Sequence, residues 1–157
     1  MSKAGYSCTT EGAIALVGTT PKSVIGVKAT ADFGCDLKKY RVAFDGVTAS
    51  AVPVLVELCY TTWATNGPGT NSTATTVRQD YGRVLSSSGF TTAAGWTSEP
   101  TVLTVIESYL LTPNGGTVLY DYPLGDTPDS NYSEGFVIRC TAPAGVNVRA
   151  SLVFERC

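Results

Sequence analysis

Residues 40–62, YRVAFDGVTASAVPVLVELCYTT, decide the fold of this chain. Apolar side chains occupy every second position from residue 40 to 44, and the alternation resumes from residue 52 to 60. A period of two is typical of a β-strand with one buried face, and the Asp-Gly pair at residues 45–46 is typical of a turn. This stretch therefore predicts two strands of one sheet, and it contains no catalytic motif.

The same pattern recurs along most of the chain. The clearest case is residues 145–156, where alternate positions from Val146 to Phe154 are apolar and the intervening ones are polar. Strands are predicted at residues 23–30, 37–45, 52–61, 101–111, 117–122, 134–141 and 145–156, with shorter ones at 76–85 and 91–94. Many strands without a helix predict an all-β fold, an antiparallel jelly-roll-like sandwich or barrel of about eight strands. An immunoglobulin-like sandwich is less favoured, because its Cys…Trp…Cys spacing is missing.

The domain organisation follows from the length and from the start of the pattern. A chain of 157 residues is long enough for one core, since a domain of this size buries roughly 68–70% of its unfolded surface. Residues 19–157 are predicted to form a single β-sandwich domain. Residues 1–18 lack clear alternation, so we expect an extended N-terminal arm that docks on a neighbour.

Composition narrows the function classes. The chain is 43% hydrophobic and 15% charged, with a net charge of −2, whereas charged residues make up about 25% of a typical domain. No cluster of Lys and Arg exceeds a pair, which argues against a nucleic-acid partner. The apolar runs are shorter than the ~20 residues of a spanning helix, which argues against a membrane. A weakly charged surface suits a protein that packs against other proteins.

The five cysteines form no CxxC pair, and the chain has no histidine, so a structural zinc site is not expected. Buried thiols are the simpler interpretation. By strand parity Cys140 faces the core and Cys59 faces the opposite way. Cys8 and Cys157 lie near the two ends, where a disulfide or a contact between subunits is sterically easiest.

Enzymatic chemistry has little support in the sequence. Without histidine there is no Ser-His-Asp or Cys-His arrangement, so we expect no catalytic residues, no cofactor and no enzyme activity. Paired carboxylates among Glu57, Glu107 and Glu155 remain the alternative, although each fits an outward strand position. The acids of the 121–129 loop suggest calcium less well than an ordinary solvated loop, so no metal is predicted.

Aromatic residues flank the irregular middle of the chain, residues 62–100. Such a group can serve as a carbohydrate platform or as an interface anchor, since Trp and Tyr dominate binding hot spots, and the interface is favoured. The predicted interface residues are Tyr60, Trp63, Tyr81, Phe90 and Trp96.

Five segments, taken in order, carry a family resemblance: SVIGVKATA, FDGVTASAVPVLVELCYTT, SEPTVLTVIESYLLTPNGG, YPLG and IRCTAPAGVNVRASLVFE. Together they resemble small virion structural proteins of tailed bacteriophages, and most of all capsid decoration, or cement, proteins such as those of cyanophages. The resemblance covers roughly residues 21–156 and consists of strand and turn segments.

The resemblance implies a non-enzymatic protein that is made in the host cytoplasm and ends on the phage head surface. It implies a homotrimer that binds the major capsid protein of an HK97-fold head and stabilises contacts between capsomers. The alternative within the same resemblance is a tail- or fibre-associated protein that binds a host-surface carbohydrate.

Overall fold

A computed structural model describes residues 4–45, 52–82 and 87–157 of the chain, and in these ranges it contains twelve strands and no helix. Gly46 of the predicted Asp-Gly turn lies outside the described residues, together with the rest of residues 46–51. Residues 83–86, at the end of the strand predicted at 76–85, also lie outside them. The strands are β1 (Gly5–Thr9), β2 (Ile14–Leu16), β3 (Lys22–Lys28), β4 (Cys35–Phe44), β5 (Val54–Thr61), β6 (Thr73–Ala74), β7 (Arg78–Tyr81), β8 (Thr91–Ala94), β9 (Leu103–Leu111), β10 (Thr117–Asp121), β11 (Gly135–Thr141) and β12 (Val146–Arg156).

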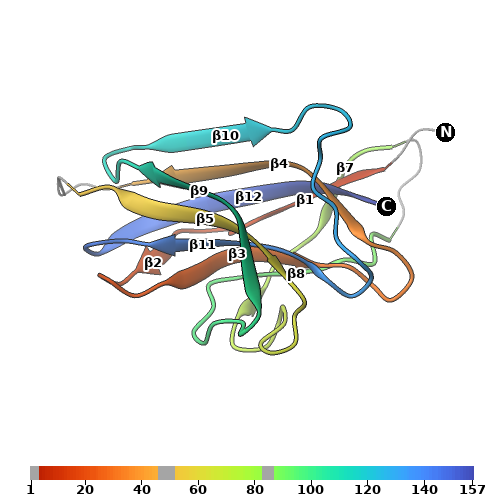
Figure 1. The fold of residues 1–157 in the computed structure, drawn as a ribbon, viewed down its shortest axis with the longest axis horizontal. Coiled ribbons are helices and arrows are strands. Elements are labelled where there is room, and N and C mark those ends of the chain that lie inside the picture. Colours follow the sequence, from red (N-terminus) through yellow and green to blue (C-terminus); the bar gives the residue numbers. More distant parts are fainter. Residues whose placement is uncertain (1–3, 46–51, 83–86) are drawn as a thin grey trace.

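The strands form two antiparallel sheets that pack face to face (Figure 1). Sheet A has the order β10-β4-β12-β1-β7, with β2 beside β12, and sheet B has the order β6-β8-β3-β11-β5-β9. The prediction that residues 40–62 supply two strands of one sheet is therefore wrong, because β4 lies in sheet A and β5 in sheet B; alternation fixes which face of a strand is buried but not which sheet the strand joins. If β1, β3, β4, β5, β9, β10, β11 and β12 are counted from one to eight, the sheets read 6-3-8-1 and 2-7-4-5. This is the strand order of a jelly roll, so the predicted all-β sandwich is confirmed. The four remaining strands are short additions.

The N-terminal segment does not form the expected arm. Gly5–Thr9 pairs residue by residue with Ser151 to Glu155 of β12, and its other edge pairs with β7. The side chains of Tyr6 and Cys8 are 1% exposed and belong to the core. The expectation of an arm is therefore wrong for the described part of residues 1–18, because β1 is the first strand of the jelly roll. The period-two signal was present in Gly-Tyr-Ser-Cys-Thr, but it spans only two apolar positions.

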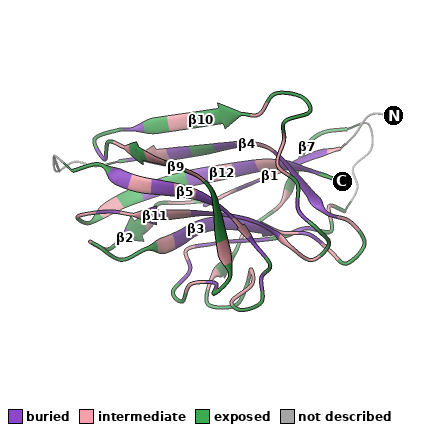
Figure 2. Cartoon of the chain, in the orientation of Figure 1, coloured by how far each residue is buried: buried purple, intermediate pink, exposed green. Residues whose placement is uncertain are grey.

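The main core lies between the two sheets and is built from the alternation seen in the sequence. In the register of β4 and β12, Tyr40 faces Leu152 and Val42 faces Ala150, and all four side chains are buried. Sheet B contributes the inward residues of β3, β5 and β11. Figure 2 shows these strands as mainly buried, whereas β10 is mainly exposed.

Candidate binding surfaces

The two tryptophans form a second hydrophobic cluster on the outer face of sheet B. Their rings stack at 5.6 Å with an interplanar angle of 17°. The Trp63 indole N–H donates to the carbonyl of Val27 at 3.1 Å, and that of Trp96 donates to the carbonyl of Asn66 at 2.7 Å. With side chains only 6% and 1% exposed, the pair packs within its own chain, so these two predicted interface anchors are not available to a partner.

A glycine in β3 makes room for this stack. A Cβ placed on Gly26 would lie 2.7 Å from the Trp63 ring and 2.9 Å from the Trp96 ring, closer than real Cβ atoms approach. Cys59, Ala93 and Val137 complete the cluster from neighbouring strands. The segments around the two tryptophans therefore fold back as a cover over the middle of sheet B.

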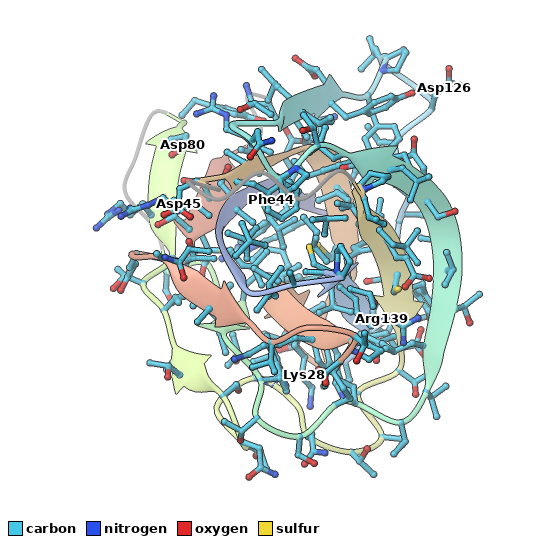
Figure 3. All side chains as sticks on the ribbon, turned by 90° about the vertical axis from the view of Figure 1, so that its left-hand side faces the viewer. Lys28, Phe44, Asp45, Asp80, Asp126 and Arg139 are labelled. Atoms are coloured by element: carbon cyan, nitrogen blue, oxygen red, sulfur yellow. The ribbon has the colours of Figure 1, made fainter. Side chains whose placement is uncertain are left out.

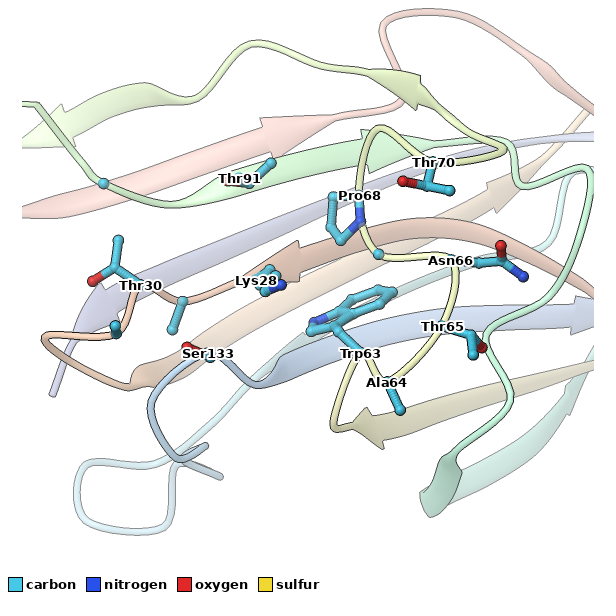
Figure 4. Close-up of a pocket in the computed structure, with 14 residues that line it drawn as sticks. Lys28, Thr30, Trp63, Ala64, Thr65, Asn66, Pro68, Thr70, Thr91 and Ser133 are labelled. Carbon is cyan, nitrogen blue, oxygen red and sulfur yellow. The ribbon is translucent and has the colours of Figure 1, made fainter.

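A polar pocket of about 470 Å³ lies above Trp63. Figure 4 shows the Trp63 ring at its centre, with Lys28 and Pro68 above it and Ser133 at the side. Hydroxyl and amide groups line most of its wall, from Thr30, Thr65, Asn66, Thr70, Thr91 and Ser133. The pocket offers hydrogen bonds to a neutral polar ligand, but it exposes too little of the indole for a broad stacking platform.

The other predicted interface aromatics lie in different places. Phe90 is buried in the main core, 4.6 Å from the Phe154 ring. Tyr60 is partly buried and packs edge-on against Phe136. Tyr81 is 45% exposed, and its hydroxyl donates to the carboxylate of Glu155. The five residues therefore do not form one surface. Tyr60 and Tyr81 lie in strands of different sheets, and Trp63, Phe90 and Trp96 lie outside the strands, where no alternation indicates which way a side chain points.

The cysteines are all thiols, and four of the five are buried. The parity predictions for Cys140, in the main core, and for Cys59, in the tryptophan cluster, are confirmed. Cys8 lies in the core and is not placed to link subunits, whereas Cys157 is exposed. Burial raises the pKa of the Cys59 thiol to about 11 and raises those of Cys8, Cys35 and Cys140 further. These four thiols are poor nucleophiles, since the thiolate is the reactive form.

The three strand carboxylates are engaged in separate contacts. Glu57 forms an ion pair with Arg139 at 3.1 Å. Glu155 receives the Tyr81 hydroxyl and lies 3.7 Å from the ammonium of Lys38. The third, Glu107, faces the space between the sheets rather than outward as expected. Nothing in this arrangement pairs two carboxylates for acid–base chemistry.

Glu107 anchors a group of tyrosines at the open side of the sandwich. Its carboxylate accepts hydrogen bonds from the hydroxyls of Tyr40 at 3.1 Å and Tyr122 at 3.2 Å. Burial is the main cause that raises the pKa of the neighbouring Tyr109 to about 12, and it raises those of Tyr40 and Tyr122 as well. Glu107 thus satisfies the hydroxyls of Tyr40 and Tyr122, whereas the buried hydroxyl of Tyr109 has no hydrogen-bond partner within the described residues.

The acidic 121–129 loop gathers no metal ligands. Among the described residues no group of three or more His, Cys, Asp or Glu side chains is placed to hold a metal ion. Asp121 is paired in register with Lys39, and Asp129 forms a backbone bridge with Asp36.

Exposed apolar residues concentrate on the side where the two sheets end in β9 and β10. Both are edge strands, and β10 runs along the top of the sandwich in Figure 1. Most of the large exposed apolar side chains of the described residues belong to this side: Val102, Val105, Ile106, Leu110, Leu119, Tyr120 and Leu124. Unpaired strand edges with apolar side chains are sites where another chain binds readily.

The outer face of sheet A is uncovered and carries cations. Arg41, Ser151 and Thr9 lie side by side on β4, β12 and β1, and Arg149 lies opposite Ala43. Together with Glu11 they surround a shallow groove of about 450 Å³. Neither arginine forms an ion pair with a described residue.

Comparison with protein-family models, with curated proteins and with solved structures finds no match for the chain. Within the described ranges the structure holds no helix of the length and apolarity that crossing a membrane requires.

Proposed function

We propose that this protein is a non-enzymatic virion structural protein, a decoration or cement protein that binds the outer surface of an HK97-fold phage head as a homotrimer. The observation that carries the proposal is the apolar side formed by β9 and β10. It belongs to a jelly roll in which the carboxylates of Glu57, Glu107 and Glu155 are engaged in contacts within the chain. A rigid body with exposed strand edges is suited to bridging other proteins.

The sequence resemblance supports the same proposal. Four of its five segments overlap β3, β5, β9, β11 and β12, and the fifth, YPLG, lies in the loop after β10. The proposed partner is the major capsid protein, and the stabilising effect follows from binding. A ligand that binds only the assembled shell shifts the equilibrium toward that shell, and several copies bound at symmetric sites act together.

The test uses heads from a virus in which the gene for this chain is deleted. Purified protein is added, the heads are sedimented, and the bound amount and the thermal stability of the heads are measured. We expect saturable binding and a higher temperature of head disruption. A matched pair of variants localises the contact: Leu110→Asp on the apolar side should abolish binding, and Val17→Asp, at another exposed apolar residue, should not. Heads that bind no protein would contradict the proposal.

The pocket above Trp63 supports a second candidate, a tail- or fibre-associated protein that binds a host-surface carbohydrate. Its lining of hydroxyl and amide groups matches the hydrogen-bonding groups of a sugar. On a glycan array, this candidate predicts binding that is lost in Lys28→Ala and Thr70→Ala. These pocket variants are more informative than Trp96→Ala, which would also damage the packing. A protein that binds no glycan would exclude the candidate.

A further inference from the structure

The most exposed large apolar side chain in the described part of the chain lies on a well-defined turn. Leu124 is 95% exposed. The N–H of Asp126 donates to the carbonyl of Pro123 at 3.0 Å, and Gly125 between them has φ of +93°. A glycine with positive φ at the third position fits a type II turn. The turn therefore presents a leucine and an aspartate in a fixed relation.

The groove on sheet A has the complementary chemistry. Arg41 is opposite Ser151, and Arg149 is two residues before Ser151 on β12, so the two arginines are diagonal neighbours. The Cβ atoms of such neighbours are within roughly 7–8 Å, close enough for both guanidinium groups to reach one carboxylate. Ala43 gives the groove an apolar floor, and Leu119 lies next to Arg41 in register.

The charges of this surface leave it cationic. Glu11 is the acid of the groove, and its carboxylate accepts the backbone N–H of Thr76 at 2.9 Å. Of the charged residues that line the groove, two are arginines and one is this engaged glutamate; Asp45, next to Asn147 at the end of β4, forms no ion pair with either arginine, so a carboxylate from outside is attracted. Asp126 in turn forms no ion pair with a described residue. The groove therefore carries positive charge, and the 123–126 turn carries the negative charge of Asp126.

The turn and the groove lie in different parts of the molecule. No residue of the 121–131 loop lines the groove. In Figure 3, Asp126 is at the upper right, whereas Asp45, at the end of β4 two residues after Ala43, lies to the left. A contact between two different surfaces of identical chains is heterologous, and it closes into a ring when the rotation between neighbours is one third of a turn.

We propose that the Pro123–Asp126 turn of one subunit inserts into the groove between Arg41 and Arg149 of the next subunit, with Leu124 on the apolar floor and Asp126 between the two arginines. The partner is a second copy of this chain. The inference rests on the proposed homotrimer and assigns its self-contact. Leu124 then belongs to the contact between subunits, while the exposed apolar side chains of β9, Val105, Ile106 and Leu110, remain free for the capsid.

The test is sedimentation equilibrium of the full-length protein over a range of concentrations. The wild-type chain is expected to be a trimer. Asp126→Lys and Arg149→Asp are each expected to weaken association by at least about tenfold, because each places like charges in a buried contact. The double variant is expected to regain association, since the exchanged charges attract again. Asp32→Lys is the matched control and is expected to leave association unchanged.

Each outcome decides the proposal. A monomeric wild-type protein overturns it, and so do single variants that associate normally or a double variant that does not recover. Thermal melts of the variants exclude unfolding as the cause. If the single variants stay trimeric but lose head binding, the groove belongs to the capsid contact and the self-contact is wrong. Conversely, a trimer that depends on these residues but binds no head supports this contact and contradicts the proposed function.

Discussion

The outer faces of the two sheets differ in what covers them. On sheet B, Trp63 and Trp96 stack over Gly26 and bury the middle of the face under their own loops. On sheet A the face is open, and Arg41 and Arg149 stand beside small polar residues. The two tryptophans thus complete the fold, whereas the polar face of sheet A stays uncovered, as the proposed contact with a second copy requires.

The largest effect should follow from removing the strand at the N-terminus. Deletion of residues 1–12 takes β1 from between β12 and β7 and exposes core residues that pack on Tyr6 and Cys8. Because a domain is stable by only about 5–15 kcal/mol, we expect loss of the cooperative thermal transition in circular dichroism. A truncated chain that still melts cooperatively near the wild-type temperature would mean that residues 1–12 are an arm after all.

The covered face should depend strongly on its tryptophans. Trp96→Ala removes a fully buried ring and its hydrogen bond to Asn66, and we expect a loss of about 3–5 kcal/mol in the free energy of unfolding. Denaturation by urea measures it. The matched control is Leu124→Ala, an exposed position whose substitution should cost less than about 0.5 kcal/mol in the monomer. Equal effects of the two variants would contradict the packing role of the stack.

Gly26 should be sensitive to a single methyl group. Gly26→Ala forces the two rings apart, with an expected cost of about 1–3 kcal/mol. Gly12→Ala serves as the control, because a Cβ there meets nothing within 4 Å. A neutral Gly26→Ala variant would show that the stack adjusts freely, and the description of a tightly covered face would then be wrong.

The buried Cys59 thiol of the covered face should make the free energy of unfolding depend on pH. Burial raises the pKa of Cys59 from 9.0 to about 11. The folded state thus favours the neutral thiol, so its contribution to stability is complete below pH 9 and is lost as the pH rises toward 11. We expect urea midpoints to fall more steeply between pH 9 and 11 in the wild type than in Cys59→Ala. Cys157→Ala, at an exposed thiol, should follow the wild type.

The smallest effect on stability should come from the open face. Arg41→Ala together with Arg149→Ala removes two exposed side chains that pair with no described acid, and we expect a change within about 0.5 kcal/mol per site in urea denaturation of the dissociated chain. A loss comparable to that of Trp96→Ala would show that the arginines hold the sandwich together, and the two faces would then not differ in kind.

The sequence was most informative where a strand has one buried face. Alternation placed β4, β9 and β12 within a few residues of their observed ends. Parity assigned Cys59 and Cys140 to opposite faces, because side chains along a strand point to its two faces with a period of two. It failed for the loops. Trp63 and Trp96 lie outside the strands, so nothing local indicated that their rings fold back over Gly26. Glu107 looked outward by its polar neighbours, but β9 is an edge strand whose inner side opens toward Tyr40 and Tyr122.

The β1 strand was missed for a different reason. Tyr6 and Cys8 are its only large apolar positions, and two positions are too few to distinguish a strand from an extended arm. The groove on sheet A was also not predicted, since Arg41 and Arg149 are more than a hundred residues apart and meet only through the register of β4 and β12. Pairings of this kind are set by the topology.

We propose a decoration protein whose open face on sheet A receives the turn of a neighbouring copy, and an electron-microscopy map of the intact virion that carries this chain is the most direct test. We expect jelly-roll trimers at the threefold junctions of the head, with Asp126 of each subunit between Arg41 and Arg149 of the next. Density for the chain on the tail, or trimers on the head in which this groove is empty, would contradict it.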